Sequence, residues 1–452
     1  MPNADAAEFL IEPRWLLPVA PGHTVLEGQA VAVRGGRILA VGPAAELRQR
    51  CPARTRILRE HHALLPGLVN AHTQACHTLL RGMPVRGPRL RWVSESLAAR
   101  ERRALSADLV RDGTRLAIAE MLSAGITCYA DRSPLPEEAA RVAAAAQVRA
   151  LIGLPIAEAA SVWAEDITAH LAKAETLWDE YRSNARIELY FAPQAAHGLS
   201  DASLLRVRRV ADELDARIVI HLDELPEEAD AADAGDPAPE AVMAVADGAA
   251  APRHSWGTRR LARLKALGLL RPGFSAIGAL GSNDEDSQQL ARHGAALIAC
   301  PQAELRLQRG SPVPPRGRPN ALGTDSAAAV GALDLLAEAR AAALLFGLTA
   351  LEALRLVTLG GAMALGLATE IGSIEPGKSA DLICLDLDTP GCRPQTDVAA
   401  TIVFGATRSQ VTDVWSAGRA VVSEGHLRLF DEEELAALAA QWARRLTLEA
   451  AA

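Results

Sequence analysis

The chain lacks the features that mark several common classes of protein. Its six cysteines are scattered without a Cys-x-x-Cys pair, so we expect no disulfide framework and place the protein in a reducing cytoplasm. Its formal charge of −8 gives no surplus of lysine and arginine for binding nucleic acid. No apolar run is long enough to span a bilayer, and the acidic first residues do not form a signal peptide. We therefore expect no contact with nucleic acid or membrane.

A further absence separates two possible architectures. Between residues 65 and 370, amphipathic helical stretches alternate with short apolar runs, which indicates a parallel sheet with crossover helices. An open, doubly wound sheet would need a Gly-rich phosphate loop after its first strand, and none is present. About eight strand–helix units favour a (β/α)8 barrel. The predicted fold is therefore α/β, with a TIM-like barrel as its main part.

The two ends of the chain follow a different pattern. Short apolar strands flank Gly35-Gly36, a pair typical of a hairpin turn, and short strands return after Gly372. The simplest arrangement joins both ends into one small β-sandwich domain, with the barrel inserted between them. We therefore predict the sandwich at residues 1–64 and 371–427, the barrel at 65–370 and a final helix at 428–452.

Polar residues directly follow three of the predicted barrel strands. Residues 70–74 read Asn-Ala-His-Thr-Gln, residues 220–224 read Ile-His-Leu-Asp-Glu, and residues 323–326 read Gly-Thr-Asp-Ser. Barrel enzymes carry their chemistry at the carboxyl ends of the strands. Each segment alone has an ordinary explanation, because a strand-end histidine is commonly a core residue and Gly-Thr-Asp-Ser is commonly a turn or helix cap. Together the three segments predict a site.

Taken in order, longer segments resemble the amidohydrolase superfamily, in the branch of methylthioadenosine/S-adenosylhomocysteine deaminases and triazine chlorohydrolases. Residues 65–72 match the family's first barrel strand, and residues 78–82 match its continuation. Residues 110–122 match the helix before the second strand, and residues 372–382 match the strand that rejoins the β domain. The resemblance covers almost the whole chain and implies the same barrel.

The resemblance implies one divalent metal, usually zinc or iron, at the strand ends. Its ligands would be a His-x-His pair on the first strand, histidines from the fifth and sixth strands and an aspartate on the eighth. The metal would lower the pKa of a bound water, and the resulting hydroxide would attack the ring carbon that bears the leaving group. A glutamate three residues after the fifth-strand histidine would carry protons.

Only part of this set is present. The retained metal and proton-transfer positions are His72, His221, Glu224 and Asp325. Gln74 replaces the second histidine of the pair, and its amide oxygen is a weak ligand. The sixth-strand histidine falls on Gly278. We therefore expect a degraded metal site.

The resemblance also implies substrate contacts. Trp92 and Glu101 keep the family's spacing, whereas Gln194 stands where the family has a substrate-contacting histidine. His77 and His197 are weak candidates for replacement metal ligands, because each lies several residues beyond its strand end. The substrate wall has therefore changed together with the metal ligands.

Two functions fit these residues. Correlated changes at four strand ends favour a non-catalytic or repurposed barrel, a pseudoenzyme that binds a small molecule or a partner and holds no cofactor. The alternative is a metal-dependent hydrolase or deaminase with a remodelled site, which would hold one zinc or iron and act on non-peptide C–N bonds of a small heterocycle or nucleoside. Whether the chain is an enzyme stays open at this point. The resemblance implies a homodimer, or a pair with an active paralogue.

Overall fold

The computed structural model describes residues 6–22, 24–83, 97–193, 198–222, 260–278, 284–307 and 317–451. The chain divides into two compact units. The first comprises Met1–Ala71, Ala119–Tyr129 and Asp334–Glu434, and the second comprises His72–Ile118, Ala130–Leu333 and Leu435–Ala452. Among the described residues, no helix is long and apolar enough to cross a membrane.

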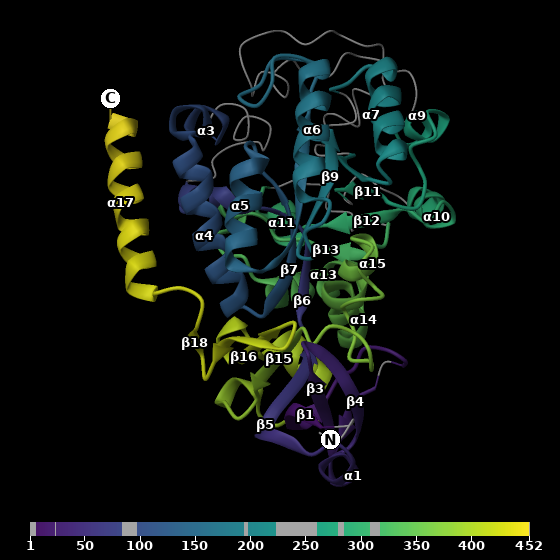
Figure 1. The fold of residues 1–452 in the computed structure, drawn as a ribbon, viewed down its shortest axis with the longest axis vertical. Helices are drawn as coiled ribbons and strands as arrows, with labels where there is room; N and C mark the ends of the chain where they lie inside the picture. Colours follow the sequence, from purple (N-terminus) through teal and green to yellow (C-terminus); the bar gives the residue numbers. More distant parts are fainter. Residues whose placement is uncertain are drawn as a thin grey trace. The chain divides into compact units, whose positions relative to one another are not determined.

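Both ends of the chain contribute to one nine-stranded sheet, which confirms that they join. Its order is β18-β17-β16-β15-β5-β1-β3-β4, with β2 beside β1 (Figure 1). The amino-terminal strands are β1 (Ala7–Leu16), β2 (Leu26–Glu27), β3 (Gln29–Arg34), β4 (Arg37–Pro43) and β5 (Ala53–Pro66). The carboxyl-terminal strands are β15 (Leu382–Asp386), β16 (Val411–Ser416), β17 (Arg419–Ser423) and β18 (His426–Leu427). The exact boundaries of the predicted domains stay a prediction.

The register of this sheet follows from a local turn and a distant pairing. Gly35 and Gly36 join β3 to β4 with φ of 57° and 75°, the left-handed conformation that a two-residue hairpin turn requires. β5 pairs antiparallel with β15, so that Pro66 lies opposite Leu382. The helices of the same unit are α1 (Ala44–Arg50), α13 (Leu335–Phe346), α14 (Ala350–Arg355), α15 (Gly361–Ala364) and α16 (Val398–Ala400).

The parallel sheet closes on itself, as the predicted barrel requires. Its order is β13-β12-β11-β10-β9-β8-β7-β6-β14. Between β13 and β14, the Gly323 N–H donates to Ala299 of β12 and the Thr324 N–H donates to His72 of β6, both at 2.9 Å. β13 and β14 therefore act as two halves of an eighth strand. The strands are β6 (Leu68–Gln74), β7 (Ile126–Arg132), β8 (Arg149–Ile156), β9 (Ile187–Pro193), β10 (Arg217–His221), β11 (Phe274–Ile277), β12 (Ala296–Ala299), β13 (Ala321–Leu322) and β14 (Asp325–Ser326).

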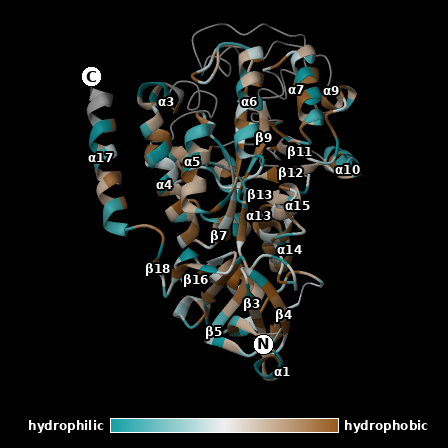
Figure 2. Ribbon diagram, viewed as in Figure 1, coloured by the Kyte–Doolittle hydropathy of each residue, from teal (hydrophilic) through white to brown (hydrophobic). Residues whose placement is uncertain are grey.

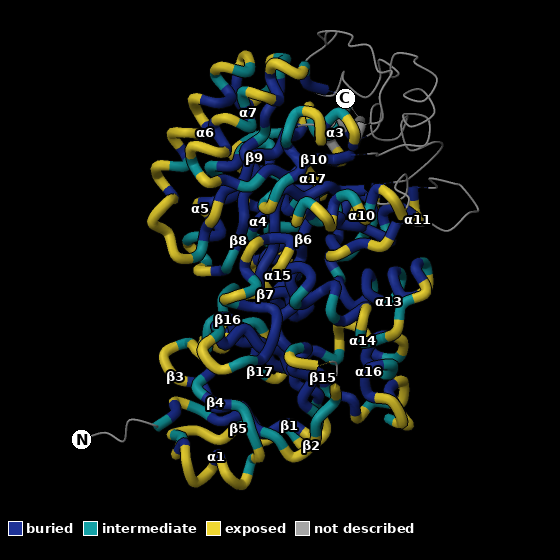
Figure 3. Tube along the Cα trace, turned by 90° about the vertical axis from the view of Figure 1, so that its right-hand side faces the viewer, coloured by how far each residue is buried: buried dark blue, intermediate teal, exposed yellow. Residues whose placement is uncertain are grey.

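Hydrophobic patterning explains this alternation of strands and helices. Strands such as β8 and β9 are buried along most of their length, whereas the helices carry a polar face (Figures 2 and 3). Polar caps start several helices, as when the Ser200 hydroxyl accepts the N–H of Ser203 at 3.2 Å. The helices of this unit are η1 (Ala75–Leu80), α3 (Ala98–Ala104), α4 (Ala107–Ser123), α5 (Pro136–Ala146), α6 (Ile167–Tyr181), α7 (Asp201–Glu213), α9 (Arg260–Ala266), α10 (Asp284–Arg292), α11 (Pro301–Arg306) and α12 (Ala327–Val330).

The final helix, α17 (Glu432–Ala451), packs against the elements that follow β6. Its buried Trp442 belongs to one apolar cluster with Leu80 and Leu109. The Trp442 Nε1–H donates to a carboxylate oxygen of Asp112 in α4 at 2.9 Å. The predicted last helix is thus present, and its inner face is part of the core of the second unit.

Candidate functional site

Strand β6 carries two candidate residues, His72 and Gln74, at its carboxyl end. Alternate residues of a strand point to the same face, so these two side chains share one face of the sheet. His72 is buried, and its carbonyl accepts the Thr324 N–H. A Cβ on Gly323 would lie 2.6 Å from that carbonyl oxygen, so a glycine is needed where the strands approach. The backbone at His72 is thus tightly held.

The structure brings His72 and His221 together. Strand β10 ends at His221, and the centroids of the two imidazole rings lie 4.9 Å apart, with an angle of 77° between the ring planes. Both side chains are buried. Two imidazoles this close can bind the same small ligand or ion. Their role as metal ligands stays a prediction.

Asp325 starts the second half of the broken eighth strand. Its φ of 55° is unusual for a residue other than glycine, and its carboxylate accepts the N–H of Ser326 at 2.8 Å. The Ser326 hydroxyl in turn caps α12 by accepting the N–H of Ala328. Asp325 is therefore held in a compact turn at the strand end.

The described residues do not complete a zinc site. A catalytic zinc takes three protein ligands and an open position. Within the described ranges, no three histidine, cysteine, aspartate or glutamate side chains are grouped so that they could hold a metal ion. His72 and His221 supply two such donors. The predicted residues Glu224, Trp92, Gln194 and His197 lie outside the described residues.

Gly278 follows β11, at the position where the resemblance places a histidine. Its φ is 101°, a conformation that residues with a side chain rarely adopt. The Gly278 N–H donates to the carbonyl of Ile298 at 3.0 Å, which holds the loop in this shape. A histidine at this position would therefore strain the backbone that the chain now has.

His77 has a different role from the one weighed for it as a replacement ligand. Its side chain is buried in η1, with Nδ1 at 3.0 Å from the Ser326 hydroxyl and Nε2 at 3.3 Å from a Glu101 carboxylate oxygen. Both ring nitrogens thus lie within hydrogen-bonding distance of other side chains. The structure links Glu101 to the strand end that carries Asp325, through His77 and Ser326.

The charges of His77 and Glu101 stabilise each other. Burial alone lowers the pKa of His77, but the Glu101 carboxylate outweighs it, so that the pKa of His77 is raised. Burial alone raises the pKa of Glu101, but His77 first and then Arg132 and Arg102 outweigh it, so that the pKa of Glu101 is lowered. Each of the two groups therefore favours the charged form of the other.

A buried carboxyl group that the sequence did not single out interacts electrostatically with His77. Asp131 in β7 is 0% exposed, and one of its oxygens accepts the N–H of Ala75 at 2.8 Å. Burial raises the pKa of Asp131 to about 7. The only signal in the sequence is an aspartate at the end of an apolar strand, which does not reveal how deeply the side chain is buried.

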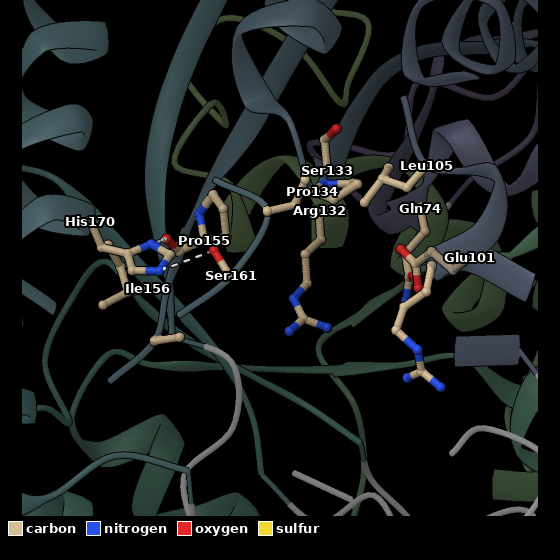
Figure 4. A pocket seen from close by; sticks show the side chains of 13 residues that line it. Gln74, Glu101, Leu105, Arg132, Ser133, Pro134, Pro155, Ile156, Ser161 and His170 are labelled. Atoms are coloured by element: carbon tan, nitrogen blue, oxygen red, sulfur yellow. Dashed lines mark hydrogen bonds between the residues drawn. The ribbon is translucent and has the colours of Figure 1, made fainter. Parts of the chain in front are cut away.

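A cavity of about 440 Å³ adjoins the end of β6, where Gln74 is one of its lining residues. Glu101 lines it on the same side as Gln74, while Ser161 and His170 line the opposite side, and Arg132 extends between the two (Figure 4). This volume suits a small molecule. The cavity unites Gln74 with Glu101, which were predicted separately as metal and substrate residues.

The wall at His170 is fixed by hydrogen bonds. Its Nδ1 lies 2.7 Å from the carbonyl of Pro155, and its Nε2 lies 3.2 Å from the Ser161 hydroxyl. Burial lowers the pKa of His170, so the ring is neutral near pH 7. This wall therefore presents polar groups to the cavity without a positive charge from His170.

A closed parallel barrel with paired histidines at its strand ends is an architecture of metal-dependent hydrolases. Residues 63–421 match the model of the amidohydrolase family, and the chain belongs to that family. Residues 30–50 also match an imidazolonepropionase-like composite domain of bacteria.

Whole-length relatives share this architecture. A 5-methylthioadenosine/S-adenosylhomocysteine deaminase of Teredinibacter turnerae is 34% identical over 99% of both chains. One of Saccharophagus degradans is 31% identical over 98% of this chain and 97% of the relative. A zinc-bound adenosine deaminase from Xanthomonas campestris superimposes with a TM-score of 0.90 at 35% identity, over 99% of this chain and 100% of the other. Zinc-bound atrazine chlorohydrolase from Arthrobacter aurescens shares the fold, with a TM-score of 0.83 at 20% identity, over 96% and 99%.

These relationships correct the expectation of a non-catalytic barrel. That expectation rested on changed positions such as Gln74 and Gly278, whereas relatives named as deaminases match the chain over nearly its full length. Physically, those changes alter the surroundings of the site while the structure keeps His72 and His221 in contact. The expectation that no metal is bound has no support either, because solved relatives hold zinc.

Proposed function

We propose that the chain is a hydrolytic deaminase that replaces the amino group of an adenine-type nucleoside with oxygen from water. The observation that carries the proposal is the contact between His72 and His221 at the carboxyl ends of β6 and β10. Barrel enzymes assemble their reactive groups at such strand ends. The names of the whole-length relatives supply the substrate class.

Water adds to the ring carbon that bears the amino group, and the amino group then leaves as ammonia. One proton must therefore leave the water, and one must reach the departing amino group. His72 and His221 contact each other at the strand ends, and Gln74, two residues after His72, lines the cavity. Glu224 keeps the predicted role of proton carrier. The described donors do not complete a zinc site, so no step is assigned to a metal.

Purified protein is assayed for ammonia release from adenosine and 5′-methylthioadenosine, with and without added zinc. We expect turnover, and expect His221→Ala to reduce it by about 100-fold or more. The control is His426→Ala, because His426 is exposed in β18. Absence of ammonia release from every aminopurine nucleoside, with zinc supplied, would refute the proposal. The homodimer stays a prediction that light scattering tests.

A further inference from the structure

Three polar side chains form a continuous bridge inside the second unit. His77 lies in η1, with Nδ1 at 3.0 Å from the Ser326 hydroxyl and Nε2 at 3.3 Å from a carboxylate oxygen of Glu101. Ser326 ends β14 and Glu101 belongs to α3, so the imidazole connects two elements that are far apart in the chain. Because His77 and Ser326 are both buried, little water competes for this hydrogen bond.

The chemistry of the partners fixes where the hydrogens of this bridge lie. His77 lowers the pKa of Glu101 against the opposing effect of burial, so at neutral pH the carboxylate is ionised and only accepts hydrogen bonds. Nε2 of His77 therefore carries a hydrogen. Nδ1 accepts the Ser326 O–H when the ring is neutral and donates to the Ser326 oxygen when the ring is protonated. In both charge states the imidazole joins Glu101 to Ser326.

Ser326 is also tied to the turn that presents Asp325. The Ser326 N–H donates to the Asp325 carboxylate at 2.8 Å, and the Ser326 hydroxyl accepts the N–H of Ala328 at 3.1 Å. The φ of 55° at Asp325 costs free energy in a residue with a side chain, so it persists only where the surroundings hold it. The Thr73 hydroxyl holds the Asp325 carbonyl at 3.0 Å. His77 supplies a second anchor, at the residue next to Asp325.

Serine, histidine and glutamate are the residue types of a nucleophilic triad, but the geometry gives them another role. Ser326 is 2% exposed, and of the described residues Glu101 lines the cavity whereas Ser326 does not. A nucleophile must be within reach of the substrate. The bridge instead runs from the cavity wall at Glu101 to the strand end at Asp325.

From this geometry we infer that His77 is a positioning residue of the proposed deaminase. Through Ser326 it fixes Asp325, the predicted proton-transfer residue, and through Glu101 it fixes one wall of the cavity. The two ring nitrogens therefore act on different kinetic constants, Nδ1 on kcat and Nε2 on KM. The inference rests on the proposed function, because it concerns the rate of that reaction.

Two substitutions separate the ring nitrogens. His77→Asn places an amide where Nδ1 lies and keeps the contact with Ser326, whereas His77→Gln places it where Nε2 lies and keeps the contact with Glu101. His77→Gln is expected to lower kcat by about 10- to 100-fold and to keep KM within a factor of about three, because Asp325 loses an anchor. His77→Asn is expected to raise KM by about 3- to 10-fold and to keep kcat within a factor of about three.

Both variants of the full chain are assayed for ammonia release from 5′-methylthioadenosine, and melting curves show that they are folded. The matched control is His293→Asn, because Nδ1 of His293 lies 2.8 Å from a carbonyl of its own helix, that of Gln289, and should change neither constant. A histidine that only stabilised the fold would lower stability and activity in both variants without separating kcat from KM. Equal kinetic effects of His77→Asn and His77→Gln, or constants like those of the control, overturn the inference.

A measurement without turnover tests the bridge itself. In NMR spectra of the imidazole nitrogens, the His77 signals are those that His77→Asn removes. Ser326→Ala should shift the Nδ1 signal, and Glu101→Gln should shift the Nε2 signal. His77 signals that respond to neither substitution overturn the inference whatever the activity. Responsive signals in a parent without turnover refute the proposed deaminase alone, and turnover without the separation of kcat from KM refutes this inference alone.

Discussion

Replacing Asp131 with asparagine should stabilise the protein at alkaline pH, because the native fold keeps this carboxyl group out of water. Asp131 is fully buried, and one oxygen accepts the N–H of Ala75. Asparagine has the same shape and keeps a carbonyl oxygen for that hydrogen bond. The substitution therefore removes the buried ionisation, but it places an amide N–H2 where the second carboxylate oxygen is buried without a hydrogen-bond partner among the described residues.

The size of the expected change in unfolding free energy follows from the shift of the Asp131 pKa. Burial raises the pKa of Asp131 from 3.8 to about 7. The native state then holds its proton more tightly than the unfolded chain, so the unfolding free energy falls as pH rises through this window and levels off above it. The resulting penalty is about 4 kcal/mol at pH 8 and about 1.5 kcal/mol at pH 5. Asp131→Asn should recover the part of this penalty that the buried amide, at about 1–3 kcal/mol, does not offset.

The assay is urea unfolding at several pH values, followed by tryptophan fluorescence. The variant should exceed the parent in unfolding free energy at pH 8, and the difference should shrink toward pH 5. Asp179→Asn, which changes a carboxylate that is 74% exposed, should alter stability by no more than about 0.5 kcal/mol at either pH. A variant that is no more stable than the parent at pH 8, or a difference that is independent of pH, would show that Asp131 does not carry this buried ionisation.

Two further substitutions test the packing around the site. Trp442→Phe keeps an aromatic ring in the core but removes the hydrogen bond to Asp112. Urea unfolding should therefore show a loss of about 1–3 kcal/mol in unfolding free energy. Unchanged stability would contradict a stabilising role for this hydrogen bond. Gly323→Ala would place a Cβ 2.6 Å from the carbonyl oxygen of His72, so activity and stability should both fall, whereas Gly42→Ala, with its nearest neighbour at 4.0 Å, should be tolerated. Equal effects of the two alanines in melting and turnover assays would exclude the close approach as the cause.

Local patterning was enough to predict most of the fold. The barrel follows from the alternation of helices and apolar strands, and the hairpin from Gly35-Gly36, because these features depend on neighbouring residues. The eighth strand was harder, since β13 and β14 have two residues each and are defined by hydrogen bonds to β12 and β6. Two residues are too few to show the alternation of apolar and polar residues that identifies a strand in a sequence.

The site was predicted only in part, for a physical reason. His72 and His221 lie at the carboxyl ends of apolar strands, so the topology of a barrel is sufficient to bring them together. His77, by contrast, meets Ser326 across 249 positions of the chain, and its contact with Glu101 depends on how η1 and α3 pack. For the same reason, the prediction of a non-catalytic barrel gave too much weight to the missing histidines. A sequence pattern identifies candidate ligands but does not show which residues surround them.

The pairing of β5 with β15 also sets the order in which the protein can assemble during synthesis. The edge of β5 that pairs with Leu382 leaves the ribosome about 300 residues before β15 does. Synthesis of the residues between them takes about 15 to 60 s at ordinary rates of translation. Until then β5 presents an unpaired edge, and such edges associate with other strands. A chain that stops before residue 382 would keep that edge open permanently, so nascent and truncated forms are where a chaperone should bind.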